Sequence, residues 1–149
     1  MKAIIVLLAG FGLALTGPGL AADPEVEHYS SNPDMQLPFS DAVRVGNMLY
    51  LSGKIGNIPG SRQLAEGGIA GETRQALENI KASLEKYGSS MDEVVKCTVF
   101  LADIAEWGAM NEVYTTFFPV NPPARSAMGA SGLALNSRVE IECLAAIRP

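Results

Sequence analysis

The alternation of apolar and polar residues is clearest near the end of the chain, at residues 138–147. Every second residue there is apolar, so the segment predicts a strand with one buried face, and Glu140 and Glu142 fall on the opposite face. Residues 94–102 alternate in the same manner and predict another strand. The residues expected on its buried face are Val95, Cys97, Val99 and Leu101.

Shorter strands and turns are predicted before and between these segments. Residues 41–52 predict a hairpin, because a Gly-Asn pair at 46–47 separates two apolar runs. Residues 125–130 predict one more strand, and a short strand is expected around His28 in the polar, proline-containing lead-in. Residues 53–68 are rich in glycine and proline and predict a loop without regular structure.

Apolar residues at helical spacing predict two helices. The first covers residues 69–87 and ends at Gly88, with Ile69, Thr73, Ala76, Leu77, Ile80, Leu84 and Tyr87 on one face. The second begins near Asp103, which forms a pattern like a capping box with Glu106, and it ends before Pro119.

The predicted order is strand, strand, helix, strand, helix, strand, strand. It indicates an α+β domain with a mixed sheet and two helices packed on one face. The other face is too apolar to be left in water, so we expect an oligomer that packs sheet faces together and places its sites between subunits. The residues that a monomer would leave uncovered are Val94, Phe100, Leu144 and Ala146.

Residues 1–22 are typical of a secretory signal. Lys2 precedes an apolar run, Gly-Pro-Gly at 17–19 breaks it, and small residues lead up to Ala22, where we expect cleavage. The apolar run is short for a bilayer span, although an uncleaved anchor is the alternative. We therefore expect a periplasmic or secreted protein with one domain at residues 23–149 and no membrane contact after cleavage.

Charge and composition restrict the partners. The chain has 11 basic and 16 acidic residues, and its basic residues are scattered, so nucleic acid is a poor partner. The only histidine is His28, so we expect no metal. Cys97 and Cys143 fall on predicted strands; they could pair in an exported protein, but we expect buried free thiols.

Arg125 and Glu140 are the candidate reactive pair. A guanidinium binds carboxylates in a fixed two-point geometry, and a carboxylate can transfer protons. Both residues lie on predicted strands where a half-buried sheet normally has apolar residues. Spacing alone favours the alternative, a structural ion pair or two solvated charges.

Several stretches together resemble one family, in the same order along the chain. They are residues 42–47, 49–53, 73–81, 94–96, 98–101, 111–114, 117–119, 123–126 and 139–142. On these stretches residues 37–149 resemble the RidA/YjgF family of reactive-intermediate (enamine/imine) deaminases, also called the liver perchloric-acid-soluble protein family. The resemblance implies a chorismate-mutase-like α+β fold and a homotrimer whose sheets form a central barrel, with clefts at the subunit interfaces.

The resemblance also implies an activity: hydrolysis, without a cofactor, of 2-imino or 2-enamino acids to 2-keto acids and ammonia. Arg125 matches the arginine that holds the substrate carboxylate, and Glu140 matches the glutamate that handles water and its protons. Glu142 is the competing carboxylate. Further positions that match the family's pocket are Ser52, Gly53, Asn111 and Ala127.

Three positions depart from the family's pattern. Phe39 replaces a tyrosine, Ala127 replaces a cysteine found in many members, and Lys54 replaces a usual glutamine beside the pocket. These changes leave the Arg–Glu pair intact but affect the expected substrate range and rate. Two alternative functions follow: a small-carboxylate binding module that has lost turnover, and an endoribonuclease or translation inhibitor.

Overall fold

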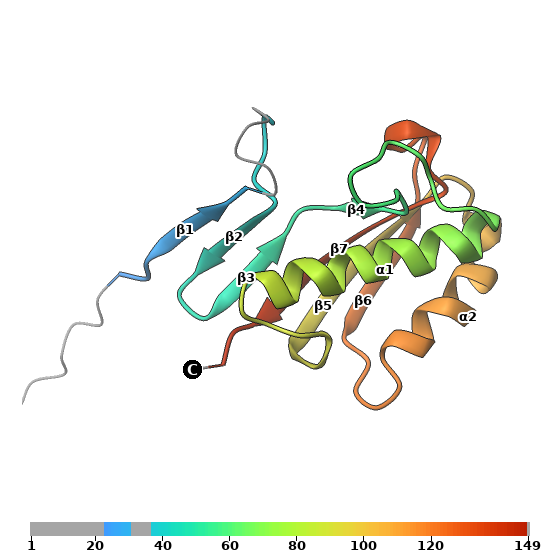
Figure 1. The fold of residues 1–149 in the computed structure, drawn as a ribbon. Helices are drawn as coiled ribbons and strands as arrows, with labels where there is room; N and C mark the ends of the chain where they lie inside the picture. Colours follow the sequence, from blue (N-terminus) through green and yellow to red (C-terminus); the bar gives the residue numbers. More distant parts are fainter. Residues whose placement is uncertain (1–22, 31–36, 149) are drawn as a thin grey trace, which may run out of the picture.

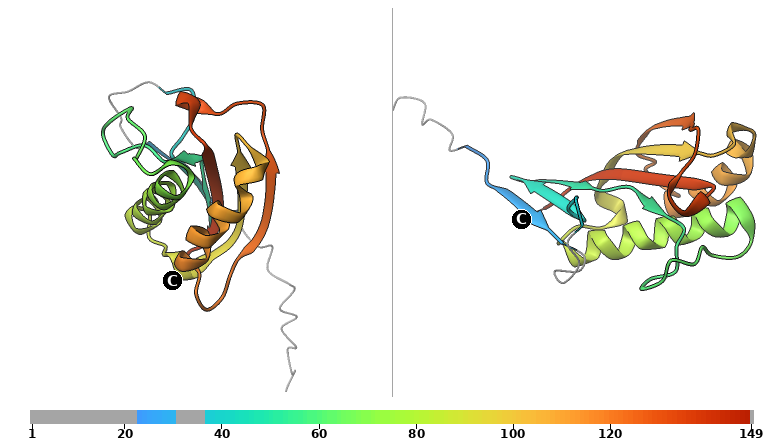
Figure 2. Two further views of the ribbon diagram at one scale, coloured as in Figure 1. Left: turned by 90° about the vertical axis from the view of Figure 1, so that its right-hand side faces the viewer. Right: turned by 90° about the horizontal axis from the view of Figure 1, so that it is seen from above.

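A mixed sheet forms the centre of the molecule, and both helices lie on the same side of it (Figure 1, Figure 2). This computed structural model describes residues 23–30 and 37–148. The strands are β1 (Val26–Tyr29), β2 (Ala42–Val45), β3 (Met48–Leu51), β4 (Lys54–Ile55), β5 (Val94–Leu101), β6 (Ala124–Gly129) and β7 (Val139–Ala146). The helices are α1 (Gly68–Lys86) and α2 (Trp107–Phe117), with short 3₁₀ turns at Met91–Glu93, Ile104–Glu106 and Ala134–Asn136. The signal expected at residues 1–22 lies outside the described residues.

The strand order of the described sheet is β1-β2-β3-β7-β5-β6, and β4 also pairs with β7. All pairings are antiparallel except that of β5 with β6. The parallel pair follows from α2, because a helix between two neighbouring strands returns the chain to the end where it started. The expected α+β class, hairpin and helices are confirmed.

The core lies between the sheet and the helices. Alternate residues of β7 are fully buried on the side facing α1, with Val139, Ile141, Cys143 and Ala145 at 0% exposure. The apolar face of α1 packs onto them. Glu140 and Glu142 accordingly lie on the side without helices, as the alternation predicts.

The loop predicted at residues 53–68 is wrong in one respect, because it contains β4. Lys54 and Ile55 pair with Ile141 and Glu140 of β7. β3 pairs with the end of β7, and the chain then returns to the same strand through β4. This short strand depends on a distant partner, so local composition does not reveal it.

The orientations predicted for Val94 and Val95 are also wrong. The ladder between β5 and β7 shifts register between Val94 and Lys96. Such a bulge places two consecutive residues against one and reverses the side on which the preceding residue lies. Val94 is therefore buried at 7% exposure, whereas Val95 is 46% exposed.

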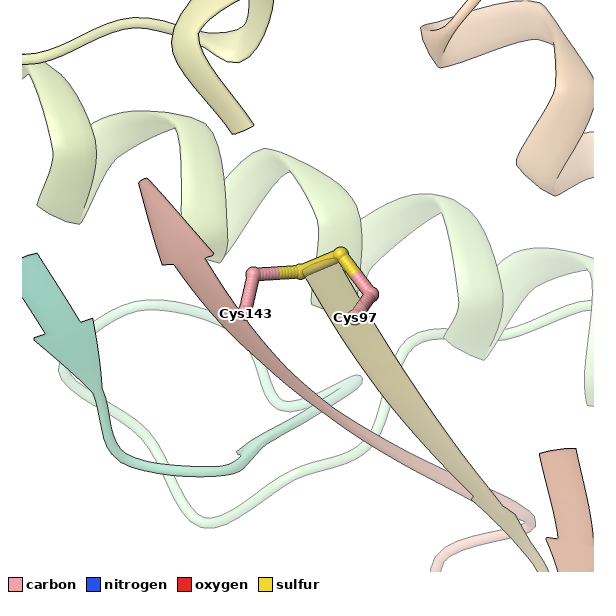
Figure 3. The surroundings of a disulfide bond; sticks show 2 residues. All are labelled: Cys97 and Cys143. Carbon is pink, nitrogen blue, oxygen red and sulfur yellow. A yellow bond between two sulfur atoms is a disulfide. The ribbon is translucent and has the colours of Figure 1, made fainter. Parts of the chain in front are cut away.

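The two cysteines form a disulfide, contrary to the expected free thiols (Figure 3). Cys97 of β5 lies directly opposite Cys143 of β7, with 4.1 Å between their Cα atoms. Both side chains are fully buried on the side facing α1. The alternation of apolar residues predicted that each cysteine lies on the buried face of its strand. The register that places the two cysteines opposite one another depends on the whole sheet.

Candidate functional site

Arg125 lies on the helix side of the sheet, beneath α2. It pairs in register with Cys97 of the neighbouring parallel strand, so its side chain shares the side on which the cysteines are buried. The guanidinium carbon lies 4.5 Å from the centre of the Tyr114 ring and 5.6 Å from that of Trp107. Both distances fall within the range for cation–π contact.

A cavity of about 230 Å³ opens beside this guanidinium. Helix α2 lines one wall with residues spaced three or four apart, and the proline pair before β6 lines another, because prolines hold the chain extended there. The lining residues are Asn111, Tyr114, Thr115, Phe118, Pro122, Pro123 and Arg125. Of the expected site residues, Asn111 and Arg125 thus come together.

Arg125 has no carboxylate partner among the residues that the structure describes. Arg44, Arg138 and Arg148 each pair with a glutamate. Arg125 is partly buried, and its guanidinium lies against the rings of Trp107 and Tyr114. A guanidinium in such a position retains its hydrogen-bond donors for an anion, and a carboxylate fits its planar fork.

Tyr114 is a site residue that the sequence pattern did not single out. It is 3% exposed, and its hydroxyl has no hydrogen-bond partner in residues 23–30 and 37–148. Burial raises the pKa of Tyr114 to about 12, although the charge of Arg125 opposes this shift. The phenol is therefore protonated at neutral pH. Its spacing of three residues from Asn111 was the signal that could have placed it in the pocket.

A second group surrounds Glu140 on the side of the sheet without helices. Glu140 pairs with Phe100 of β5 and Ile55 of β4. Its carboxylate lies against Gly53, where an added Cβ would be 2.9 Å from the Glu140 Cδ and closer still to Oε1. Glycine at this position therefore makes room for the acid.

Ser52 precedes Gly53 and is held by its own hydrogen bond. Its hydroxyl donates to the backbone oxygen of Ser40 at 2.6 Å. The Ser52 oxygen thus keeps its lone pairs to accept a hydrogen bond from a ligand. Phe39, next to Ser40, is 59% exposed.

The side chains of Lys54 and Ala127 lie on the opposite side of the sheet from Glu140. Lys54 pairs with Ile141, whose side chain faces α1, and its ammonium forms an ion pair with Asp41. Asp41 also accepts from Tyr87 at 2.9 Å and from Ser83 at 3.3 Å. Ala127 lies on the same side as Arg125 and packs against the core. The charge of Lys54 is thus engaged within the protomer rather than presented beside Gly53.

The two groups lie on opposite sides of one sheet. Arg125 shares a side with Cys97, and Glu140 shares a side with Phe100 three residues further along the same strand. Successive residues of a strand point to opposite faces, so these side chains cannot meet within one protomer. A site that uses both requires a second chain. The described residues contain no group of three or more histidine, cysteine or acidic side chains that could hold a metal.

Comparison with known proteins gives a consistent family. The family model described as endoribonuclease L-PSP matches residues 29–147. Proteins named 2-iminobutanoate/2-iminopropanoate deaminase are similar: that of Mus musculus is 44% identical over 112 residues, covering 75% of this chain and 83% of the relative. That of Homo sapiens is 45% identical over 108 residues, covering 72% and 79%.

Solved structures show the same fold. The structure of the YjgF gene product from E. coli has a TM-score of 0.71 at 33% identity and covers 78% of this chain and 93% of its own. That of RidA from an Antarctic Psychrobacter has a TM-score of 0.71 at 37% identity and covers 76% and 91%. In the part of the chain that the structure describes, no helix has the length and apolar character needed to cross a membrane.

Proposed function

This chain belongs to the endoribonuclease L-PSP family, and from that premise we propose that it hydrolyses 2-imino acids and their 2-enamino tautomers. The products are 2-keto acids and ammonia. The names of the mammalian relatives support the reaction, and the residues of the two groups support the roles. The observation that carries the proposal is a partly buried Arg125 that contacts two aromatic rings and no carboxylate in the described residues.

The chemistry follows from these residue types. Arg125 binds the substrate carboxylate, which fixes the position of C2. Glu140 takes a proton from a water molecule as the water oxygen bonds to C2 of the protonated imine. Glu140 passes that proton to the nitrogen and then accepts the remaining hydroxyl proton as the C–N bond breaks, so that ammonia leaves and the oxygen becomes the keto group. A positioned acid–base group of this kind contributes roughly 10²–10⁴-fold to rate.

The assembly that unites the groups is a homotrimer with its sites between protomers. Support comes from the face of the sheet without helices, where Tyr50 is 43% exposed and Phe100, Leu144 and Ala146 are only partly covered. This face also carries Glu140. Packing it against a second copy removes apolar surface from water and brings the acid to another chain.

Export to an oxidising compartment is part of the proposal. The apolar pattern of residues 1–22 supports it. The Cys97–Cys143 disulfide supports it independently, because such bonds persist mainly outside the reducing cytoplasm. Mass spectrometry of the exported protein is expected to find Asp23 at the N-terminus. The mass should be lower than that of the reduced protein by two hydrogen atoms.

The direct assay generates 2-imino acids in situ with an amino-acid oxidase and follows release of keto acid and ammonia. The wild type is expected to accelerate release, and Arg125→Ala to abolish most of the acceleration. Loss of the contact between the Arg125 guanidinium and the substrate carboxylate should weaken transition-state binding by roughly 2–4 kcal/mol. If the wild type and the variant accelerate release equally, the site is wrongly assigned. Binding of a keto acid without turnover would instead favour the binding-module alternative.

A mixing experiment tests whether the site is shared between chains. Arg125→Ala and Glu140→Gln are each expected to be inactive alone. Co-refolded in equal amounts, they give mixed assemblies in which some sites receive Arg125 from one chain and Glu140 from its neighbour. Random assembly of a cyclic trimer predicts about a quarter of the wild-type activity. No recovery would contradict a site that takes Arg125 from one chain and Glu140 from another.

The family description also names an endoribonuclease. The formal net charge of −5 opposes binding to a phosphate backbone. Intact RNA after incubation with highly purified protein is the expected result, and cleavage that Arg125→Ala abolishes would support the alternative.

A further inference from the structure

Two aromatic rings lie beside the Arg125 guanidinium, and both come from α2. Trp107 and Tyr114 are seven residues apart, which is about two helical turns and returns to the same side of the helix. Their ring centres lie 5.6 Å and 4.5 Å from the guanidinium carbon. These two residues form an aromatic pair.

The aromatic pair can hold the guanidinium without consuming its donors. A ring face attracts a cation through its quadrupole, whereas the hydrogen bonds to a carboxylate lie in the plane of the guanidinium. The side chain is thus held in place before any anion binds. Less rotamer entropy is then lost on binding, which favours affinity.

The position of Trp107 is itself fixed by the turn before α2. The Asp103 side chain accepts a hydrogen bond from the Ala105 amide at 2.9 Å, which caps that turn. Glu106, directly before Trp107, forms an ion pair with Arg138 next to β7. These contacts anchor the start of α2 although Trp107 is 43% exposed.

We propose that the aromatic pair positions Arg125 for the substrate carboxylate, and that Trp107 thereby determines affinity for 2-keto and 2-imino acids without touching their reacting atoms. The inference rests on the proposed function of Arg125. Trp107 is a positioning residue in this account.

Fluorescence tests the contact directly, because Trp107 is the only tryptophan of the chain. Titration of the oxidised wild-type protein with 2-oxobutanoate is expected to change tryptophan emission with saturation. Arg125→Gln, the matched control, should show only the linear decrease caused by collisional quenching. A saturable change that persists in Arg125→Gln would overturn the proposal.

Calorimetry with the same ligand tests the consequence for affinity. Trp107→Ala should raise the Kd for 2-oxobutanoate about three- to thirty-fold, with Tm and oligomeric state retained. Trp107→Phe keeps a ring and should stay within about threefold of the wild type. If Trp107 had only a structural role, Trp107→Ala would lower Tm and leave the Kd for 2-oxobutanoate unchanged. Equal Kd values for Trp107→Ala and the wild type, or equal losses in Trp107→Ala and Trp107→Phe, contradict the inference.

The outcomes separate this inference from the proposed function. Saturable fluorescence and rescue by phenylalanine, without turnover of imino acids by the wild type, would refute the deaminase activity and support the role of the aromatic pair. Turnover by the wild type with an unchanged Kd in Trp107→Ala would do the reverse.

Discussion

Removal of the Cys97–Cys143 bond should lower the stability of the protein substantially. The two residues are 46 apart in sequence, so the bond closes a long loop in the unfolded chain. The chain-entropy relation for a loop of this length gives about 4 kcal/mol of stabilisation at 25 °C. For a domain of this size that corresponds to a decrease in Tm of about 10–15 °C.

The assay is urea unfolding of the oxidised wild type, the reduced wild type and the double variant Cys97→Ala/Cys143→Ala. The chain has only two cysteines, so a reductant acts on a single bond. The double variant is the matched control, because its unfolding should not respond to reductant. Protomer concentration is held constant, since the stability of an oligomer depends on it.

Two results would refute this reasoning. One is an unchanged midpoint on reduction of the wild type. The other is a titration that finds two free thiols per chain in the denatured, unreduced protein. Reduced wild type retains both sulfur atoms, so a difference from the oxidised form reflects the covalent bond rather than lost packing.

Three further predictions follow from individual contacts. Gly53→Ala should abolish turnover while the fold is retained, because a methyl group would displace the Glu140 carboxylate; normal activity with the same circular dichroism would contradict this. Glu140→Gln should lower kcat about 10²–10⁴-fold, whereas Glu142→Gln should retain activity; the opposite ranking would make Glu142 the acid. Burial opposes ionisation of Asp41, but hydrogen bonds from Lys54 and its other partners outweigh it and lower its pKa. The stability from this group is therefore present above about pH 4 and is lost as pH falls through the lowered pKa. Urea midpoints between pH 6 and pH 3 should fall less steeply for Asp41→Asn than for the wild type, and parallel slopes would exclude Asp41.

The sequence predicted those elements that depend on local periodicity. Spacing from Ile69 to Tyr87 gave α1 with its buried face, and Gly88 follows the last helical turn. Alternation gave β7 with Glu140 and Glu142 on one side. In these segments the spacing of the apolar residues matches the period of the helix or strand. The sequence therefore indicates which residues are buried.

Features that depend on pairing between distant strands were not predictable in this way. β4 exists because β7 extends past the end of β3, and the disulfide exists because β5 and β7 pair in one particular register. The bulge beside Val94 moved Val95 to the exposed side. A shift of one residue changes the face of every residue before it, and no local pattern fixes that shift.

The residues of the candidate site also divide into those that the sequence reveals and those that only the packing reveals. Arg125, Glu140 and Asn111 were recognisable from motifs, but Trp107 and Tyr114 carry no charge and fit the apolar stripe of an ordinary helix. Their contact with Arg125 needs the placement of α2 against β6. Packing, rather than sequence pattern, makes site residues of the half-exposed Trp107 and the buried Tyr114.

The disulfide joins the strand beside Arg125 to the strand that carries Glu140 within one protomer. Cys97 pairs in register with Arg125, and Cys143 lies three residues after Glu140 on β7. The bond therefore fixes the strand beside the arginine relative to the strand that carries the acid. Its sulfur atoms are buried beneath α1, on the face away from Glu140, where neither substrate nor water reaches them. A thiol placed there has no route to the reaction, so loss of the bond should reduce the folded population while each folded site keeps its kcat.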